Sequence, residues 1–236
     1  MEFLVKDRSI VTPGMAIAKG PFRYEYGVDK FEDTIISSVL GIVYIENDGI
    51  RVVPLEGKYM PKTGDDVIGT IVSINPLSWD LDINAPYLAN LHVQDALRYV
   101  KDTSNLERIF KVGDVIYANI KDVGESSDIV LQSKERPYGK LKWGRVVKIH
   151  ATRVPRVIGK KGSMIKLLKQ MTRCEIMVGQ NGNIWIKGER QMEDIVERAI
   201  LKIDKEAHIP GLTDRIKKYL KQKYQCNIRC YKWRKT

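Results

Sequence analysis

The chain has 236 residues, 43% of them hydrophobic, and a formal net charge of +11 at pH 7. This length suits two or three small domains better than a single core. No apolar stretch approaches a membrane span, the first residues lack a signal-peptide layout, and three cysteines are too few for a disulfide framework. These properties argue against a membrane protein and against a disulfide-stabilised secreted domain, and we expect a cytoplasmic protein.

The positive charge is concentrated in two segments of the sequence. Residues 140–173 contain eleven Lys or Arg and residues 215–236 contain nine, and neither segment contains an acidic residue. The rest of the chain carries 20 basic and 29 acidic residues. Because the signs are sorted by segment, the sequence predicts a surface that binds a polyanion, with nucleic acid rather than a membrane as the partner.

Residues 1–62 predict a small all-β module. Strand-like stretches at 34–39, 41–45 and 49–55 alternate with turn signals, and the sequence Asn-Asp-Gly at 47–49 indicates a hairpin between the last two. With eight basic and nine acidic residues the module is nearly neutral, so we do not expect it to bind phosphate. It could equally be a docking surface or a plain folding unit.

Residues 63–137 contain a second β pattern, with strand-like stretches at 67–74, 79–83, 112–120 and 129–132. Strands of this number and spacing suit a five-stranded barrel of the OB type, a fold that binds oligonucleotides. The stretches GDDVIGTIVSI, WDLDI and VGDVIYANI resemble an S1-type RNA-binding domain.

This barrel offers few groups with which to hold RNA by itself. S1 domains usually present aromatic residues after the first strand for base stacking, but residues 75–80 contain only Trp79. The domain also has twelve acidic and seven basic residues. We therefore expect the barrel to guide RNA rather than bind it strongly. Its candidate RNA contacts gather in a long connection, at Arg98, Lys101 and Arg108.

Residues 142–207 predict the element order β-α-α-β-β-α. The expected strands cover 145–149, 174–178 and 183–187, and the expected helices begin near 155, 163 and 190, with the last one ending near 207. The Asn-Gly step at 181–182 indicates a hairpin between the second and third strands. This order, with a glycine turn between the first two helices, resembles the KH domain.

The glycine turn is the strongest functional signal in the chain. Gly159 and Gly162 let the backbone turn tightly and approach a ligand closely, and two lysines lie between them. Gly162 leads into a helix whose free N–H groups favour phosphate. The turn resembles the GXXG signature of KH domains, which clamps about four nucleotides of single-stranded nucleic acid. The candidate RNA-binding residues here are Arg153, Arg156, Ile158, Gly159, Lys160, Lys161, Gly162, Ile165 and Lys166.

Residues 208–236 predict a basic helical tail. From Leu212 onward, Ile216, Leu220 and Tyr224 fall on one side of a helix, which leaves the lysines facing solvent or nucleic acid.

The sequence contains few groups of residues that could form a catalytic site. Asp80 and Asp82 lie on one side of an expected strand and could bind Mg²⁺, as could the pair Asp65 and Asp66, but acidic residues on a barrel are usually only solvated. No P-loop, zinc signature or nucleophile elbow is present. We therefore predict no catalytic residue, no metal site and no cofactor, and we expect the protein not to be an enzyme.

The fold class is thus multidomain α+β: an N-terminal β module, an S1-type OB-fold barrel, and a KH domain with a basic tail. This order in so short a chain is similar to the KH-containing cap subunit of the archaeal RNA exosome. The resemblance implies an RNA-binding adaptor, present in three copies, whose N-terminal module docks on a ring of RNase PH-like subunits. Its barrel would line the pore through which RNA enters for 3′–5′ degradation. The alternatives are a translation- or ribosome-associated RNA-binding factor and a metal-dependent nuclease.

Overall fold

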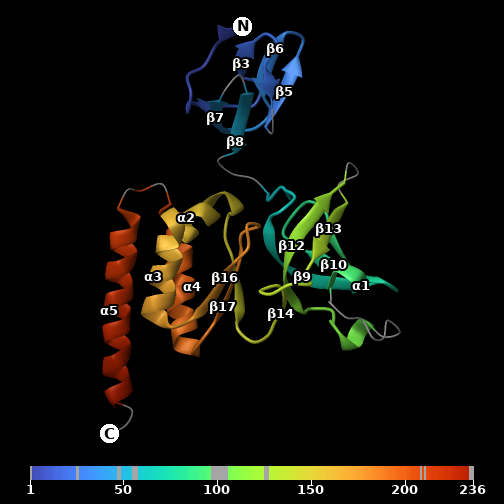
Figure 1. Ribbon diagram of the computed structural model, residues 1–236. Coiled ribbons are helices and arrows are strands. Elements are labelled where there is room, and N and C mark those ends of the chain that lie inside the picture. Colours follow the sequence, from blue (N-terminus) through green and yellow to red (C-terminus); the bar gives the residue numbers. More distant parts are fainter. Residues whose placement is uncertain are drawn as a thin grey trace. The chain divides into compact units, whose positions relative to one another are not determined.

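The computed structural model describes residues 2–24, 27–46, 49–54, 58–96, 106–124, 128–207, 209 and 211–233, with the side chains of the last helix described as far as residue 222. The chain divides into two compact units, residues 1–57 and residues 58–236 (Figure 1). Among the described residues, no helix is long and apolar enough to cross a membrane.

The N-terminal unit consists of two small sheets, with strand orders β1-β3-β6-β5 and β2-β7-β8-β4. In β6 and β8 every second side chain is buried, because successive residues of a strand point to opposite faces. The antiparallel pairing of β7 with β8 confirms the predicted hairpin, although Asn47 and Asp48 lie outside the described residues. The strands are β1 (Glu2–Phe3), β2 (Ile10–Val11), β3 (Ala16–Lys19), β4 (Arg23–Tyr24), β5 (Val28–Phe31), β6 (Thr34–Ser37), β7 (Gly41–Glu46) and β8 (Gly49–Pro54).

The second unit begins with a closed five-stranded barrel, as predicted. Its strands follow the order β9-β10-β11-β13-β12, and β12 pairs again with β9, so that no edge is left between them. Strand β11 was missed by the sequence pattern; it closes the barrel through a parallel pairing with β13. The elements are β9 (Asp66–Ile74), β10 (Ser78–Asp82), β11 (Ala89–His92), α1 (Val93–Ala96), η1 (Leu106–Arg108), β12 (Val115–Val123), β13 (Ile129–Gln132) and β14 (Gly139–Leu141), which extends the sheet beside β12.

Two details of the barrel differ from the sequence interpretation. The strand expected from residue 112 begins at Val115, because Asp114 closes a turn by donating its N–H to the carbonyl of Lys111 at 3.0 Å. Trp79 is fully buried in the barrel core, where its ring meets Phe110 edge-on with centroids 5.1 Å apart. Trp79 is therefore a core residue and offers no exposed face for base stacking.

The C-terminal part has the predicted order β-α-α-β-β-α. Three antiparallel strands form a sheet in the order β15-β17-β16, and helices cover one face of it (Figure 1). The elements are β15 (Arg145–Lys148), η2 (Ala151–Arg153), α2 (Val154–Ile158), η3 (Lys160–Gly162), α3 (Ser163–Thr172), β16 (Glu175–Val178), β17 (Asn183–Lys187) and α4 (Arg190–Lys205). The hairpin predicted at residues 181–182 is confirmed by the pairing of β16 with β17.

The predicted tail helix is α5 (Leu212–Trp233). Its residues Leu212, Ile216 and Leu220 are buried in the same apolar cluster as the core of the KH domain. The apolar face therefore continues that core, and Lys217 and Lys218 are exposed on the outside. The side chain of Tyr224 lies outside the described residues.

The barrel and the KH sheet are joined by the turn between β16 and β17. Asn181 is fully buried, and its side-chain amide donates to the carbonyls of Ile68 at 2.8 Å and Ile83 at 2.7 Å, while its oxygen accepts from the N–H of Ile68 at 3.3 Å. Asn183 adds a bond to the same Ile68 carbonyl at 2.7 Å, and the N–H of Gln180 donates to the carbonyl of Asp66 at 2.7 Å. Strand β9 is therefore bonded directly to the KH hairpin.

An apolar cluster reinforces this joint. Its buried members come from both domains, and it is separate from the barrel core and from the KH core. They are Ile68, Tyr117 and Trp185, with Val115, Tyr138, Leu141, Val146 and Met177 packed around them.

Candidate nucleic-acid interface

The glycine turn connects α2 to α3 through a tight backbone path. Gly159 ends α2 with φ 73° and ψ 170°, and its N–H donates to the carbonyl of Pro155 at 2.9 Å. Lys161 and Gly162 are both left-handed, with φ values of 52° and 75°. Ser163 follows as the first residue of α3. The four residues thus form a compact turn directly before a helix N-terminus.

The two glycines are needed for different reasons. A Cβ at Gly159 would lie 2.8 Å from the backbone nitrogen of Met164 and 2.9 Å from the hydroxyl of Ser163, so a side chain there would push α3 away from the turn. A Cβ at Gly162 would meet nothing closer than a methyl group of Ile165 at 3.7 Å, so only its left-handed backbone favours glycine. The surface of the turn at Gly162 is therefore open to a ligand.

Unpaired positive charge surrounds the turn. Arg156, Lys160, Lys161 and Lys166 are exposed, and within the described part of the chain none of them forms an ion pair with a carboxylate. Helix α3 has no acidic residue in its first turn and no side chain capping its N-terminus. Its first N–H groups and its dipole therefore add to the attraction for an anion.

Apolar side chains flank the charged turn. Ile158 precedes it and Ile165 follows it, and both are half-buried where they pack against the KH core. One side of each residue thus supports the helices, and the other remains available to an apolar ligand surface such as a base.

Arg153 has a different environment from the other cations predicted to bind RNA. Its guanidinium donates to the backbone carbonyl of Asp204, near the end of α4, at 2.5 Å, and its side chain is 26% exposed. The carboxylate of Asp204 also lies 3.1 Å from the ring nitrogen of His150. Arg153 therefore fixes the segment before α2 to α4 and orients the turn, rather than extending freely into solvent.

Of the three cations predicted on the barrel, the structure describes one. Arg98 and Lys101 lie outside the described residues. Arg108 ends η1 and is exposed on the barrel, in a different domain from the turn.

The carboxylates considered as metal ligands are used by the barrel itself. Asp80 accepts hydrogen bonds from Ser73 at 2.7 Å, Asn75 at 2.8 Å and Asn90 at 3.0 Å. Burial favours a higher pKa for Asp80, but these three bonds outweigh it and lower the pKa below its usual value. Asp82 accepts from the N–H of Asn84 at 2.8 Å and so shapes the turn after β10.

The acidic pair at the start of β9 also accepts hydrogen bonds from its neighbours. Asp65 accepts from the hydroxyl of Tyr59 at 2.6 Å, and Asp66 accepts from the hydroxyls of Tyr117 at 3.2 Å and Tyr138 at 2.8 Å. Burial, reinforced by these carboxylates, raises the pKa of both Tyr59 and Tyr117. In the part of the chain that the structure describes, no group of three or more His, Cys, Asp or Glu could hold a metal ion.

One exposed aromatic residue was missed by the sequence reasoning. Trp143 lies just before β15, with 85% of its surface exposed and a left-handed φ of 64°. The signal that could have identified it is a tryptophan between basic residues in the short connection from barrel to KH domain, where no core position is expected.

Three protein-family models match the chain in succession. The N-terminal domain of the exosome RNA-binding protein RRP4 matches residues 8–56, the RRP4 S1 domain matches residues 58–122, and a KH domain matches residues 144–192.

Whole-chain comparisons agree with these matches. The chain is 46% identical over 226 residues to the exosome complex component Rrp4 of Pyrococcus horikoshii, which covers 94% of this chain and 85% of that protein. It is also 46% identical over 216 residues to the protein of the same name from Methanothermus fervidus, covering 92% and 96%. A crystal structure assigned to an exosome complex RNA-binding protein superimposes with a TM-score of 0.67 at 36% identity, covering 72% of this chain and 99% of that one.

Proposed function

Because the chain belongs to the family of the exosome complex component Rrp4, we propose that it is a non-catalytic cap subunit of an archaeal RNA exosome. In this role it captures single-stranded RNA and passes it to a ring of RNase PH-like subunits that degrade it from the 3′ end. The matches to an RRP4 N-terminal domain, an RRP4 S1 domain and a KH domain support this proposal. The chain acts in the cytoplasm, with three copies on each ring.

The geometry of the glycine turn is the observation that carries the proposal. Gly159 brings α3 close to the turn, Gly162 leaves its surface open, and Lys160 and Lys161 stand at its tip without a carboxylate partner among the described residues. A backbone phosphate placed there meets the N-terminus of α3 and two ammonium groups. Arg156 and Lys166 extend the positive surface, and Ile158 and Ile165 lie beneath the bases.

The other parts of the molecule have supporting roles in this proposal. The nearly neutral N-terminal module docks on the ring, and the barrel lines the path of the RNA, with Arg98, Lys101 and Arg108 as its contacts. The proposed absence of catalysis is supported by the acidic residues of the barrel, since Asp65, Asp66, Asp80 and Asp82 all accept hydrogen bonds within the fold. Degradation therefore belongs to the ring.

Reversing the charge at the tip of the turn tests the proposal. The double substitution Lys160→Asp and Lys161→Asp should weaken binding of a labelled single-stranded RNA by about a hundredfold or more, because two attractive contacts with phosphate become repulsive. Fluorescence anisotropy measures the affinity, and circular dichroism verifies the fold. Unchanged affinity in the folded variant would show that this turn is not the RNA site.

A matched control separates the local effect from net charge. Lys217→Asp with Lys218→Asp, an adjacent exposed pair on α5, alters the net charge equally and should weaken binding far less. For the unmodified chain, contact with about four to five phosphates predicts that log K falls against log salt with a slope of roughly −3 to −3.5. The slope should become shallower in the variant of the turn and stay the same in the control.

Purification from cells tests the proposed assembly. The tagged chain should recover RNase PH-like subunits, and adding it to those subunits should increase their degradation of RNA that they bind weakly alone. Recovery with ribosomal particles instead would favour the translation-associated alternative. Mutation-sensitive RNA cleavage by the purified chain alone would favour a nuclease.

A further inference from the structure

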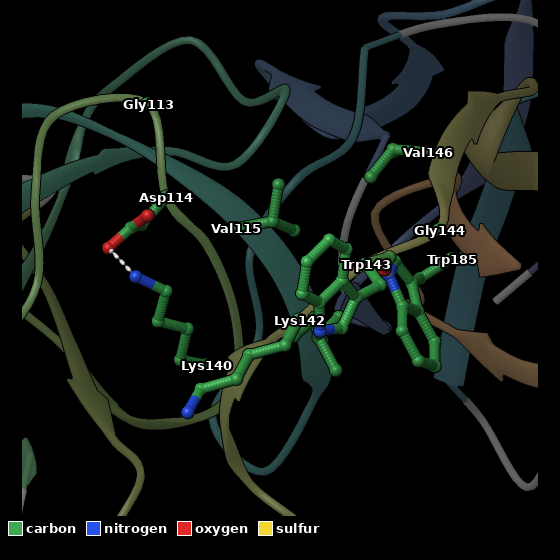
Figure 2. A pocket seen from close by; sticks show the side chains of 10 residues that line it. Gly113, Asp114, Val115, Lys140, Lys142, Trp143, Gly144, Val146 and Trp185 are labelled. Atoms are coloured by element: carbon green, nitrogen blue, oxygen red, sulfur yellow. Dashed lines mark hydrogen bonds and ion pairs between the residues drawn. The ribbon is translucent and has the colours of Figure 1, made fainter. Parts of the chain in front are cut away.

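A groove of about 420 Å³ lies where the barrel meets the KH domain. Figure 2 shows the indoles of Trp143 and Trp185 at one end of it and the ion pair of Lys140 with Asp114 at the other. The lining comes from both domains and from the segment that connects them: Gly113, Asp114, Val115, Lys140, Leu141, Lys142, Trp143, Gly144, Val146 and Trp185.

The exposed indole of Trp143 stands on a fixed backbone. The carbonyl of Trp143 accepts a hydrogen bond from the indole N–H of Trp185 at 2.9 Å, and Trp185 is itself buried. A Cβ at the next residue, Gly144, would lie 2.3 Å from the carbonyl oxygen of Ile186, so the chain passes tightly against β17 at this point. The backbone is thus held in place, while 85% of the surface of Trp143 remains exposed.

The chemistry of the groove suits a nucleotide. An exposed indole presents a flat aromatic face on which any base can stack. Lys142 beside it is exposed and has no carboxylate partner among the residues that the structure describes, and Lys140 offsets the charge of Asp114. Several residues that line the groove belong to the start of the basic segment 140–173, which contains no acidic residue. An aromatic face beside a cation without a carboxylate partner thus matches a base and its neighbouring phosphate.

We propose that Trp143 is a stacking platform for one base of single-stranded RNA, with Lys142 contacting the adjacent phosphate. This site rests on the proposed RNA-binding function and adds to it a second contact, at the junction of barrel and KH domain.

The proposed platform and the glycine turn are distinct places on the chain. Strand β15, η2 and α2 separate them, and the four residues of β15 alone span roughly 13 Å at about 3.3 Å per residue. The KH clamp accommodates about four nucleotides. We therefore expect an RNA that contacts both places to be longer than the four nucleotides held by the clamp, so that the contribution of the platform depends on the length of the RNA.

Titrations of the full chain with two oligoadenylates test the platform. Trp143→Ala should weaken binding of an oligoadenylate of about twelve nucleotides by roughly five- to tenfold, the lower part of the range for stacking of one base. Binding of a four-nucleotide oligoadenylate, which the clamp holds alone, should change by less than about twofold. Trp143→Phe should restore most of the affinity, because phenylalanine also offers an aromatic face. Phe31→Ala, which removes an exposed aromatic from the N-terminal unit, is the matched control and should have no effect.

Tryptophan fluorescence provides a second readout. The longer oligonucleotide should quench the emission of the unmodified chain, and Trp143→Phe should remove most of that quenching while binding persists. If Trp143→Ala and the unmodified chain bind the longer RNA with equal affinity, the proposal that Trp143 stacks on a base is wrong. This holds even if the variant loses binding to a protein subunit instead. If, in that case, the double variant at Lys160 and Lys161 still loses RNA binding, the proposed function is supported and only the role of Trp143 is rejected. If the unmodified chain binds neither RNA, both ideas fail.

Discussion

In the barrel, Asp66 and Asp80 each accept three hydrogen bonds from neighbouring side chains, whereas around the glycine turn Lys160 and Lys161 have no ion-pair partner among the described residues. Both domains carry many charges, but they use them differently. The acidic side chains of the barrel satisfy its own polar groups, and the basic side chains of the turn point to solvent without compensation.

This difference shows that a charged side chain indicates a binding surface only where no hydrogen bond or ion pair within the fold already engages it. Arg153 and Arg145 belong to the basic segment, yet Arg153 donates to Asp204, and Arg145 pairs with Glu193 and Glu197. Within the described part of this segment, the exposed cations that form no ion pair include Arg156, Lys160, Lys161 and Lys166 around the turn and Lys142 in the groove. Substitutions in the joint, the turn and the barrel can therefore test this difference between the two domains.

The largest effect is expected at the joint that holds the two domains together. Asn181→Ala removes three buried hydrogen bonds and leaves backbone groups of Ile68 and Ile83 with fewer partners, which should cost about 2–4 kcal/mol of the free energy of unfolding. Urea denaturation of the full chain measures it. Gln180→Ala, which alters an exposed side chain in the same turn, should cost less than about 0.5 kcal/mol. Similar stability of the two variants would mean that the domains are not coupled through Asn181.

A smaller and more specific effect is expected from the two glycines of the turn. Gly159→Ala should lower RNA affinity about tenfold and stability by about 2–3 kcal/mol, because its Cβ meets the backbone of Met164 in a conformation suited to glycine. Gly162→Ala has open space and should cost only about 1 kcal/mol for its left-handed backbone. Titration and denaturation of both variants check the order, and a larger loss at Gly162 would contradict this account of the turn.

The smallest effect is expected on the barrel. Arg108→Ala removes at most one phosphate contact, so RNA affinity should fall by less than about threefold and the salt slope should become shallower by no more than about 0.7. Anisotropy at several salt concentrations measures both quantities. A loss of affinity as large as that of the double variant at Lys160 and Lys161 would mean that the barrel, rather than the KH domain, provides the main RNA contacts.

Local signals were sufficient for much of the fold. The hairpins at residues 47–49 and 181–182, the closed barrel, the helix after Gly162 and the apolar side of α5 all follow from turn residues and periodicity, and all are confirmed. Strand β11 was missed because its sequence, Ala-Asn-Leu-His, contains one large apolar side chain, whereas the equally short β13 contains three. The roles of the RNA-binding candidates remain predictions.

The contacts that depend on distant residues could not be predicted from local patterns. Asn181 has the sequence signal of an ordinary turn, but its side chain bonds to backbone groups about a hundred residues away in the chain. In the sequence Arg153 is indistinguishable from its basic neighbours, but in the fold it donates to the carbonyl of Asp204 near the end of α4. The exposed position of Trp143 likewise depends on how the connection passes β17. In each case the tertiary fold, rather than the residue type, decides the role.

The bonded joint between β9 and β17 has a mechanical consequence. Domains connected only by a linker can rotate when one of them is pulled. A force on a bound RNA strand would then reorient one domain and would not reach the other. Here Asn181 and Asn183 tie the KH hairpin to the barrel strand, and reorientation would require breaking buried hydrogen bonds. Tension on RNA held at the proposed site would therefore be passed on to the barrel, and the two domains would resist it together.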